Sequence, residues 1–267
     1  MTARPARVTF LGSGTSHGVP MIGCSCATCH SNDPHDRRLR PSVYLQVANG
    51  PSLLVDTSTD LRQQAITHQV ARVDAILFTH SHADHVMGLD EVRRFNMLQR
   101  SSIPAYADER TATDLRRMFS YIFDPPAEQG GGIPQISLSQ IDGPFTVQSI
   151  LITPVEIFHG PRPILGFRFG NFAYLTDCNR IPDASFDLLG DLDVLVLDAL
   201  RHRPHPTHFT VAEAVRVVDR VKPRQTFLTH ICHDLPHAAT NASLPAGVEL
   251  AYDGLTFDIA VDGVEPI

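Results

Sequence analysis

Six consecutive residues, numbers 80 to 85, read His-Ser-His-Ala-Asp-His and constrain this chain more than any other segment. They follow an apolar stretch at residues 75–79, which predicts a buried strand that leads into His80. His80 and His82 point to one side of an extended chain, whereas Asp84 and His85 face elsewhere as the chain turns toward a helix. Four titratable groups this close together would be costly to bury unpaired. The hexapeptide therefore predicts a site for two divalent metals, with ligands that suit zinc, manganese or iron.

Three further candidate ligands lie at the ends of predicted strands. His159, Asp177 and His230 each follow an apolar run, as His80 does. Taken singly, a histidine after a strand is more often a hydrogen-bonded residue, and Asp177 alone would be typical of a turn. Loops at one edge of a rigid scaffold can converge, however, and two metals need more ligands than the hexapeptide supplies. We therefore expect these three residues to complete the site.

Three of the five cysteines, Cys24, Cys26 and Cys29, form a second cluster. In a reducing compartment, clustered thiols are typical of metal ligands rather than of disulfides. A set of small buried residues is the alternative interpretation, and three thiols within six residues make it the weaker one. Cys178 and Cys232 flank candidate ligands, and we interpret both as packing residues.

Composition bounds the class of protein. The chain has 267 residues, 43% hydrophobic and 19% charged, which fits one large domain, residues 1–267, better than two small ones. Acidic residues outnumber basic ones, 29 to 22, and the net charge of −7 does not support a broad basic surface for nucleic acid. The basic run of Arg37, Arg38 and Arg40 is interpreted as a solvated loop. The chain shows no membrane-spanning run and no leader pattern, so we expect a cytoplasmic protein without a membrane partner.

Short apolar runs between turn signals predict many strands and few helices. The predicted strands cover residues 8–11, 43–47, 52–55, 75–79, 149–158, 165–169, 172–176, 194–198, 226–229, 248–251 and 255–259. The predicted helices cover residues 60–69, 89–98, 109–123 and 211–221, the last with Thr210 as its N-cap. The strands fall into an early and a late batch. This mix favours an α/β fold in which two sheets pack together with helices outside.

The candidate ligands, in this order, resemble those of the metallo-β-lactamase superfamily, whose mark is H-x-H-x-D-H followed by a lone His, a bridging Asp and a last His. The resemblance covers nearly the whole chain and implies a four-layer αββα sandwich with two metals at the edge between the sheets. It implies that one metal is held by His80, His82 and His159, the other by Asp84, His85 and His230, and that Asp177 bridges them. An Asp at the bridge resembles the branches that act on phosphodiesters, not the antibiotic-hydrolysing branch, which uses a thiolate.

The N-terminal segment narrows the resemblance. The glycine-rich residues 12–20 and the cysteine cluster are similar to those of the phosphoribosyl cyclic phosphate phosphodiesterase family. That resemblance implies a structural zinc held by Cys24, Cys26, Cys29 and His233, and such a Cys3His set is a standard zinc arrangement. His30 competes for the fourth position, but its place beside Cys29 makes the geometry awkward. The glycines are interpreted as a tight turn that lets the backbone approach the metals, and His17 is given no role.

Together these residues predict a metal-dependent phosphodiesterase for a small cyclic or nucleotide-like substrate. Two metals roughly 3.5–4 Å apart would share a water, lower its pKa toward about 7 and offset the charge that grows on the phosphoryl oxygens. Asp84 is assigned a catalytic role besides metal binding. His208 resembles the general acid of the family, although from spacing alone a solvent-exposed loop histidine fits equally well. Asp56 matches a position that orients a metal-binding histidine, with a simple strand-end turn as the alternative.

Other functions fit part of the pattern. A tRNA 3′-processing endonuclease would need a protruding arm and basic residues, and neither is clear here, so nucleic acid is not the expected partner. A non-hydrolytic relative of the pyrroloquinoline quinone synthesis protein has a similar cysteine cluster, although its ligand set is not kept as it is here. A purely structural zinc protein is a further alternative, and would bind one metal where the hydrolase binds about three. The expected partner is a small phosphorylated molecule, and the resemblance suggests a homodimer.

Overall fold

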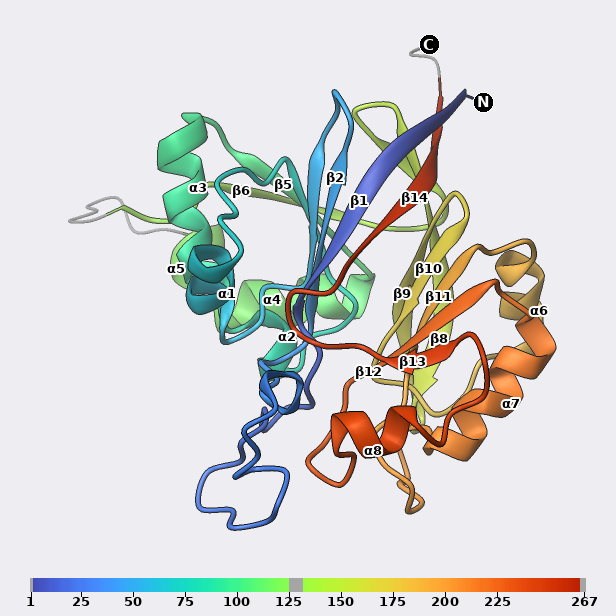
Figure 1. Ribbon diagram of the computed structural model, residues 1–267. Helices are drawn as coiled ribbons and strands as arrows, with labels where there is room; N and C mark the ends of the chain where they lie inside the picture. Colours follow the sequence, from blue (N-terminus) through green and yellow to red (C-terminus); the bar gives the residue numbers. More distant parts are fainter. Residues whose placement is uncertain (1, 125–131, 265–267) are drawn as a thin grey trace.

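Two β-sheets lie at the centre of the protein, and helices cover their outer faces, in a computed structural model that describes residues 2–124 and 132–264 (Figure 1). The predicted domain range also includes residue 1, residues 125–131 and residues 265–267, which lie outside the described residues. Within the described residues, every helix is too short or too polar to cross a bilayer.

The described residues form fourteen strands and eight α-helices. The strands are β1 (Thr2–Gly12), β2 (Ser42–Val47), β3 (Ser52–Val55), β4 (Ala75–Leu77), β5 (Ile103–Ala107), β6 (Ile136–Gln140), β7 (Phe145–Val147), β8 (Ile150–His159), β9 (Arg162–Phe169), β10 (Phe172–Leu175), β11 (Val194–Asp198), β12 (Gln225–Thr229), β13 (Val248–Leu250) and β14 (Thr256–Gly263). The helices are α1 (Leu61–Thr67), α2 (Ala83–Val86), α3 (Val92–Gln99), α4 (Glu109–Met118), α5 (Ser120–Phe123), α6 (Asp183–Phe186), α7 (Val211–Val221) and α8 (His237–Asn241). Short 3-10 turns lie at Pro34–Asp36, Leu89–Glu91 and Asp187–Leu189.

The strands follow one hydrogen-bonded path that bends into two sheets. Their order is β13-β12-β11-β10-β9-β8-β14-β1-β2-β3-β4-β5-β6, and β7 pairs with β8. The start of β8 belongs to the first sheet, beside β14, and its end belongs to the second, beside β9. Apolar residues from both sheets fill the space between them; for example, Phe10 of β1 meets Phe227 of β12 edge-on, with ring centroids 6.3 Å apart.

Each sheet also buries its outer face, against helices. Leu61 of α1, Phe95 of α3 and Leu115 of α4 cover the first sheet, and Val211 and Ala214 of α7 help to cover the second. Thr210 caps α7 as predicted, because its side chain accepts a hydrogen bond from the Glu213 amide. Helix, sheet, sheet and helix therefore form four layers, which confirms the predicted αββα sandwich.

Parallel strands bring their carboxyl ends to one edge of each sheet. In the first sheet β3, β4 and β5 are parallel neighbours, and in the second β10, β11, β12 and β13 are. Asp56 directly follows β3, and the hexapeptide follows β4 after two residues. Asp177, Asp198 and His230 lie at the ends of β10, β11 and β12. Ligand-binding side chains commonly gather at such an edge of parallel strands.

Arg38 shows that the basic run is not a solvated loop. Its side chain is fully buried and donates to the carbonyl oxygens of Cys232 at 3.0 Å and Leu235 at 2.7 Å, as well as to Asp36 at 3.2 Å. Only Arg37 of the run is exposed.

Two glycines of the N-terminal stretch are required by this same segment, and the stretch also pairs with Ile231 beside His230, where the Thr15 amide donates to the Ile231 carbonyl oxygen at 3.1 Å. A Cβ added to Gly14 would lie 2.8 Å from the carbonyl oxygen of Arg38, and one added to Gly12 would lie 1.9 Å from that of Arg40. Both positions therefore need glycine, because the backbone of residues 38–40 approaches too closely for any side chain.

Candidate metal centre

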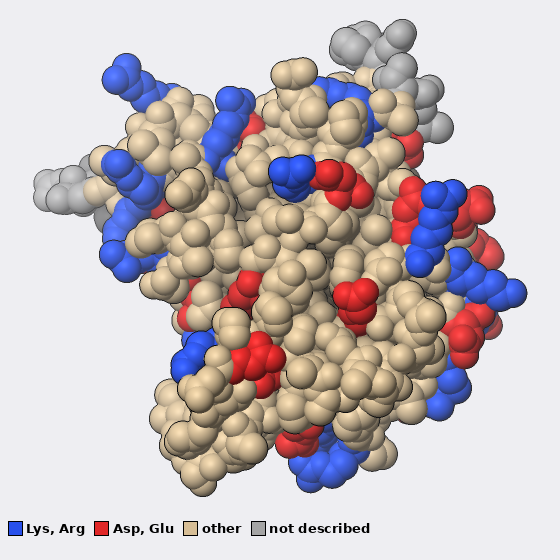
Figure 2. All heavy atoms as spheres, viewed as in Figure 1, with Lys and Arg blue, Asp and Glu red and all other residues tan. Residues whose placement is uncertain are grey.

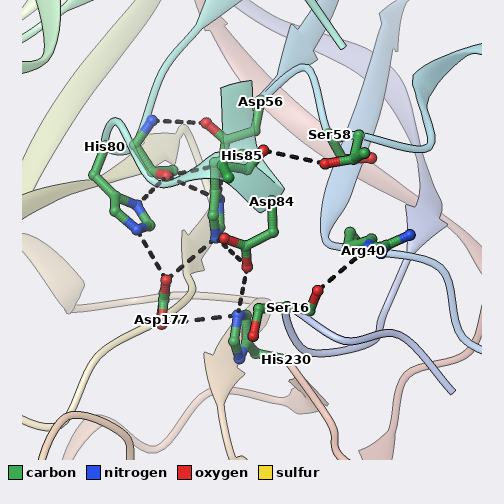
Figure 3. A network of polar contacts seen from close by, with 12 residues as sticks. Ser16, Arg40, Asp56, Ser58, His80, Asp84, His85, Asp177 and His230 are labelled. Carbon is green, nitrogen blue, oxygen red and sulfur yellow. Dashed lines mark hydrogen bonds and ion pairs between the residues drawn. The ribbon is translucent and has the colours of Figure 1, made fainter. Parts of the chain in front are cut away.

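Asp177 lies beside His80, His85 and His230, which come from both sheets (Figure 3). Its Oδ2 is 2.9 Å from His80 Nε2 and 3.2 Å from His85 Nε2. Its Oδ1 is 3.3 Å from His159 Nδ1 and 3.7 Å from His230 Nε2. A single buried carboxylate thus faces ligand atoms from opposite sides of the site.

The potential ligands around Asp177 form three overlapping groups, two of which consist of residues predicted as ligands. In one group, Asp84, His85, Asp177 and His230 each offer an atom within 4.8 Å of the others, and in the second, His80, His82 and Asp177 do so. His159 lies beside the second group, with its ring centroid 5.1 Å from that of His82. The structure therefore brings all seven predicted ligands together, with His159 beside the second group rather than within it. Only His82 among them is exposed.

Several buried polar atoms at this place lack a hydrogen-bond partner. They are His80 Nε2, His85 Nε2, both ring nitrogens of His230, and Asp177 Oδ1. These atoms approach one another at ion-pair distances but without hydrogen-bond geometry. Because buried polar groups are nearly always satisfied, the orphaned atoms indicate a missing partner. Imidazole nitrogens and a carboxylate oxygen are the donor set of zinc and similar divalent ions, so the residues fit such ions.

The protonation states favour metal binding. Burial lowers the pKa of His80 to about 3 and also lowers the pKa values of His82 and His159, so these rings are neutral and free to ligate. Burial opposes the charge of Asp177, but His230 and His80 beside it hold its pKa well below the usual range. The group thus combines neutral imidazoles with an anionic carboxylate.

His85 shows where positive charge is needed. Burial disfavours a charge on this ring, yet Asp84 and Asp56 raise its pKa well above the ordinary value for histidine. Without a metal, a proton on His85 compensates the converging carboxylates. A divalent cation would take the place of that proton, because a metal ligand must be deprotonated.

A supporting network fixes the histidines from behind. Asp56 Oδ2 lies 2.7 Å from His85 Nδ1 and accepts from the hydroxyl of Thr79 at 2.8 Å. The same hydroxyl lies 3.0 Å from His80 Nδ1, where it accepts because its own proton is given to Asp56. Both rings therefore hold their proton at Nδ1 and turn Nε2 toward Asp177. The geometry supports the orienting role expected of Asp56 rather than a simple strand-end turn.

The backbone is strained at three of these positions. Asp56, Asp177 and His230 have φ values of 64°, 60° and 60°, in the left-handed region that residues other than glycine seldom adopt. Each such conformation costs on the order of 1–3 kcal/mol and persists only where the surrounding structure enforces it. Strain at the ends of three separate strands, β3, β10 and β12, is typical of a functional site.

His208 is buried, at 7% exposure, so its interpretation as a solvent-exposed loop histidine is wrong. Its Nδ1 lies 3.2 Å from Asp198 Oδ1 and 3.1 Å from Asp177 Oδ1. Asp198 is completely buried and also accepts a hydrogen bond from the Phe209 amide at 3.0 Å. No role is predicted for Asp198 from the sequence, although it ends a predicted strand between the strands of Asp177 and His230, which is the signal that would have found it.

The cysteine cluster forms a second potential metal site. His233 Nδ1 lies 3.2 Å from the Sγ of Cys24, 3.5 Å from that of Cys26 and 3.6 Å from that of Cys29. A backbone hydrogen bond from Cys29 lowers the pKa of the Cys26 thiol to about 7, which favours the thiolate that zinc requires. His30 instead turns its Nδ1 to the carbonyl oxygen of Cys26, at 3.3 Å. The structure thus brings His233, and not His30, to the three sulfurs.

A pocket of about 280 Å³ adjoins the centre at His208 and lies between the two potential metal sites. Its lining comes from residues 15–21, 200–208 and 232–234. The lining includes His17 on the N-terminal loop and the half-buried Arg201. The Nε and NH2 groups of Arg201 donate to the carbonyl oxygens of Arg203 and Pro204, which holds the guanidinium in place.

Comparison with known proteins gives the same fold. A family model described as the Beta-lactamase superfamily domain matches residues 52–231. The crystal structure of a new diphosphatase from the PhnP family superposes with a TM-score of 0.91 at 45% identity, over 98% of this chain and 100% of that one. Zn(2+)-bound PqqB from Methylobacterium extorquens superposes with a TM-score of 0.78 at 20% identity, over 95% and 100% of the two chains, which shows a shared fold alone.

A curated relative is an octanoyltransferase from Porphyromonas gingivalis, 35% identical over 260 residues. That match covers 97% of this chain but 52% of the relative, so the chain spans about half of that protein's length. The matched family model and the likeness over full length to the diphosphatase agree with the order of ligands along the chain. The chain therefore belongs to the β-lactamase superfamily, with the metallo-β-lactamase fold and a PhnP-like structure.

Proposed function

We propose that this protein hydrolyses a small phosphodiester with the help of two divalent metals, zinc or manganese, and that a further zinc at the cysteines is structural. One observation carries the proposal: Asp177 belongs to both groups of potential ligands, so one carboxylate would serve two neighbouring cations. His80, His82 and His159 would hold one of them, and Asp84, His85 and His230 the other. The similarity to a PhnP-family diphosphatase supports phosphorus chemistry, and the unpaired buried imidazole nitrogens and carboxylate oxygen support divalent metal.

The chain's own residues prepare the reaction. When bound, the metals would supply Lewis-acid charge at the phosphoryl oxygens and a water of lowered pKa. Asp56 and Thr79 hold the protons of His85 and His80 at Nδ1, away from the substrate. Asp198 faces Nδ1 of His208, which leaves Nε2 as the atom that can give a proton to the leaving oxygen. Burial lowers the pKa of His208 and so disfavours the charged ring that donation from Nε2 requires, whereas the nearby carboxylates of Asp177 and Asp84 favour it.

The pocket beside His208 supports a small, anionic substrate. Its volume of about 280 Å³ suits a phosphorylated sugar or nucleotide rather than a polymer. Arg201 has no carboxylate within 4.0 Å among the described residues, so its charge is free to bind an anion. His17, to which the sequence pattern gives no role, lines the same pocket and is a candidate second contact for that anion.

A substrate panel tests the proposal. Purified, metal-loaded protein is assayed with cyclic phosphoribose, 2′,3′-cyclic nucleotides, bis(p-nitrophenyl) phosphate and precursor tRNA. We expect hydrolysis of at least one small phosphodiester and none of precursor tRNA. Failure to hydrolyse any phosphodiester, with the metals shown to be present, would overturn the proposal and favour a non-hydrolytic role.

Replacing His208 with alanine is expected to lower turnover by about 10²–10⁴-fold, the usual contribution of a general acid, while the metal content is unchanged. The measurement is kcat together with metal analysis of the same sample. The exposed neighbour His202, replaced in the same way, is the matched control. Because His208 also lies with Asp177, Asp198 and His230 in a group of potential ligands, loss of metal in the variant would show that it is a ligand and not the acid.

Neither octanoyl transfer nor tRNA processing is proposed. The octanoyltransferase is about twice as long as the region that this chain matches, and the name of the whole relative does not assign an activity to that half. On the face shown in Figure 2, acidic and basic side chains are interspersed and form no continuous basic surface. A nuclease that grips tRNA would need such a surface, and its binding would weaken steeply with salt.

A further inference from the structure

We infer that Arg162 is a positioning residue that holds His82 and His159, one half of the metal centre, in register with each other. It does so through Ser81 and Asp114. Neither of these residues, nor Arg162 itself, is a potential metal ligand. The inference rests on the proposed two-metal function, because it concerns how one of the two metals is kept.

Ser81 stands between His80 and His82 and is 8% exposed. Its hydroxyl donates to Asp114 Oδ2 of α4 at 2.6 Å and accepts from the NH2 group of Arg162 at 2.8 Å. Arg162 NH2 also lies 3.7 Å from the same carboxylate oxygen. The loop that carries His82 is therefore tied to a helix on one side and to strand β9 on the other.

Arg162 is itself fixed beside His159. The two residues face each other across the hairpin of β8 and β9, as the last pair before the turn. The other side of that turn is held by Asn179, which accepts from the Gly160 amide at 2.9 Å and donates to the carbonyl oxygen of Pro206 at 2.8 Å. Within the described residues, Arg162 is therefore the link from this hairpin to the Ser81 hydroxyl.

The burial of Arg162 argues for a specific role. Its side chain is 14% exposed, and its Nε is buried without a hydrogen-bond partner. Taking a guanidinium out of water is costly, and one ion pair at 3.7 Å offsets that cost poorly. An arginine whose only role was to form an ion pair with Asp114 could do so from the surface. Arg117 does this, with 79% exposure and a 3.4 Å contact to Asp114.

The contacts of Arg162 reach only one half of the centre. His85 is held by Asp56, and His230 lies against Asp198, both remote from Ser81 in the hydrogen-bond network. His82 has no contact with Asp56 or Thr79 among the described residues, and so depends on its own loop. Removing Arg162 should therefore weaken one metal position and spare the other.

The test compares Arg162→Met with the matched control Arg117→Met, which removes an exposed guanidinium from the same Asp114. Each protein is loaded with zinc and dialysed against graded concentrations of a chelator, and the zinc remaining per chain is counted. Protection of the cysteines from a thiol reagent shows that their site stays filled. We expect Arg162→Met to lose one active-site metal at a roughly 10–100-fold lower chelator strength, the usual effect of removing a partner behind a ligand. The second active-site metal and the cysteine site should be retained as in wild type and in Arg117→Met.

Equal weakening of both active-site metals, or no weakening, would overturn the inference. If Arg162→Met does not fold, Ser81→Ala removes the same link without unburying a charge and should show the same selective loss. A wild-type protein that binds only one metal outside the cysteine site would instead overturn the two-metal function on which the inference rests. Two metals in wild type and two equally tight metals in both variants would overturn the positioning role alone.

Discussion

Replacing Asp177 with asparagine should abolish the binding of both active-site metals and lower turnover by about a thousandfold or more. The change keeps the shape of the side chain but removes the negative charge that faces His80, His85, His159 and His230. Because this carboxylate belongs to both groups of ligands, neither cation keeps its full charge compensation. The measurement is metal content per chain alongside kcat, with an expected fall from about three metals to one.

Asp187 follows Asp177 in the chain and is exposed, so Asp187→Asn provides the matched control. That variant should keep all metals and full activity. Loss of a single active-site metal from Asp177→Asn would contradict a shared position and would assign Asp177 to one cation. Retention of activity would remove the basis of the proposed function.

Replacing Arg38 with methionine is expected to lower the free energy of unfolding by about 3–5 kcal/mol, because it leaves a buried partner charge without compensation. Asp36, which is 5% exposed, would lose its ion pair, and the carbonyl oxygens of Cys232 and Leu235 would lose their donor. Urea denaturation at a fixed free zinc concentration measures the change, provided that the slope of the transition is unaltered.

Arg37→Met removes the neighbouring guanidinium, which is exposed, and should change the same free energy by no more than about 0.5 kcal/mol. An equal effect of the two substitutions would mean that the loss of positive charge, and not the loss of buried hydrogen bonds, destabilises the protein. A shift below about 1 kcal/mol in Arg38→Met would show that water satisfies the exposed carbonyls.

Much of the fold follows from local sequence, because period-two apolar runs report buried strands directly. β3 and β11 have the predicted bounds, and so does helix α7, which a capping box begins at Thr210. Strands β5, β6 and β7 are not predicted. β5 contains Pro104, β6 is largely exposed, and β7 has three residues, so none produces a continuous apolar run. These three segments form strands because neighbouring strands pair with them, and not because of their own composition.

The ligands could be predicted because they lie at the ends of strands. An apolar strand followed by His or Asp recurs several times along the chain and marks them. What could not be found are contacts between residues far apart in sequence. Ser81 and Arg162 are 81 positions apart, so spacing alone gives no sign of their contact. His233 is more than 200 positions from the thiols, and only the family resemblance predicts that it joins them. The burial of Arg38 is hidden for the same reason, since its partners lie 194 and 197 positions away. A run of arginines carries no local signal of the carbonyls that it will meet.

The pairing of Arg38 with the segment around His233 has a consequence for how metal is captured. Cys24 and His233 are 209 positions apart, and Arg38 and Cys232 are 194 apart, so both contacts close almost the same loop of chain. The entropy of loop closure depends only weakly on length, about 0.6 kcal/mol per doubling. Whichever of the two contacts forms first therefore bears nearly the whole entropic cost of closing the loop. Once Arg38 is seated, the imidazole of His233 is held near the thiols at a high effective concentration. A zinc ion at the cysteines would thus act as a removable cross-link between distant parts of the chain, and an isolated peptide of residues 24–29 should bind zinc far more weakly than the folded protein does.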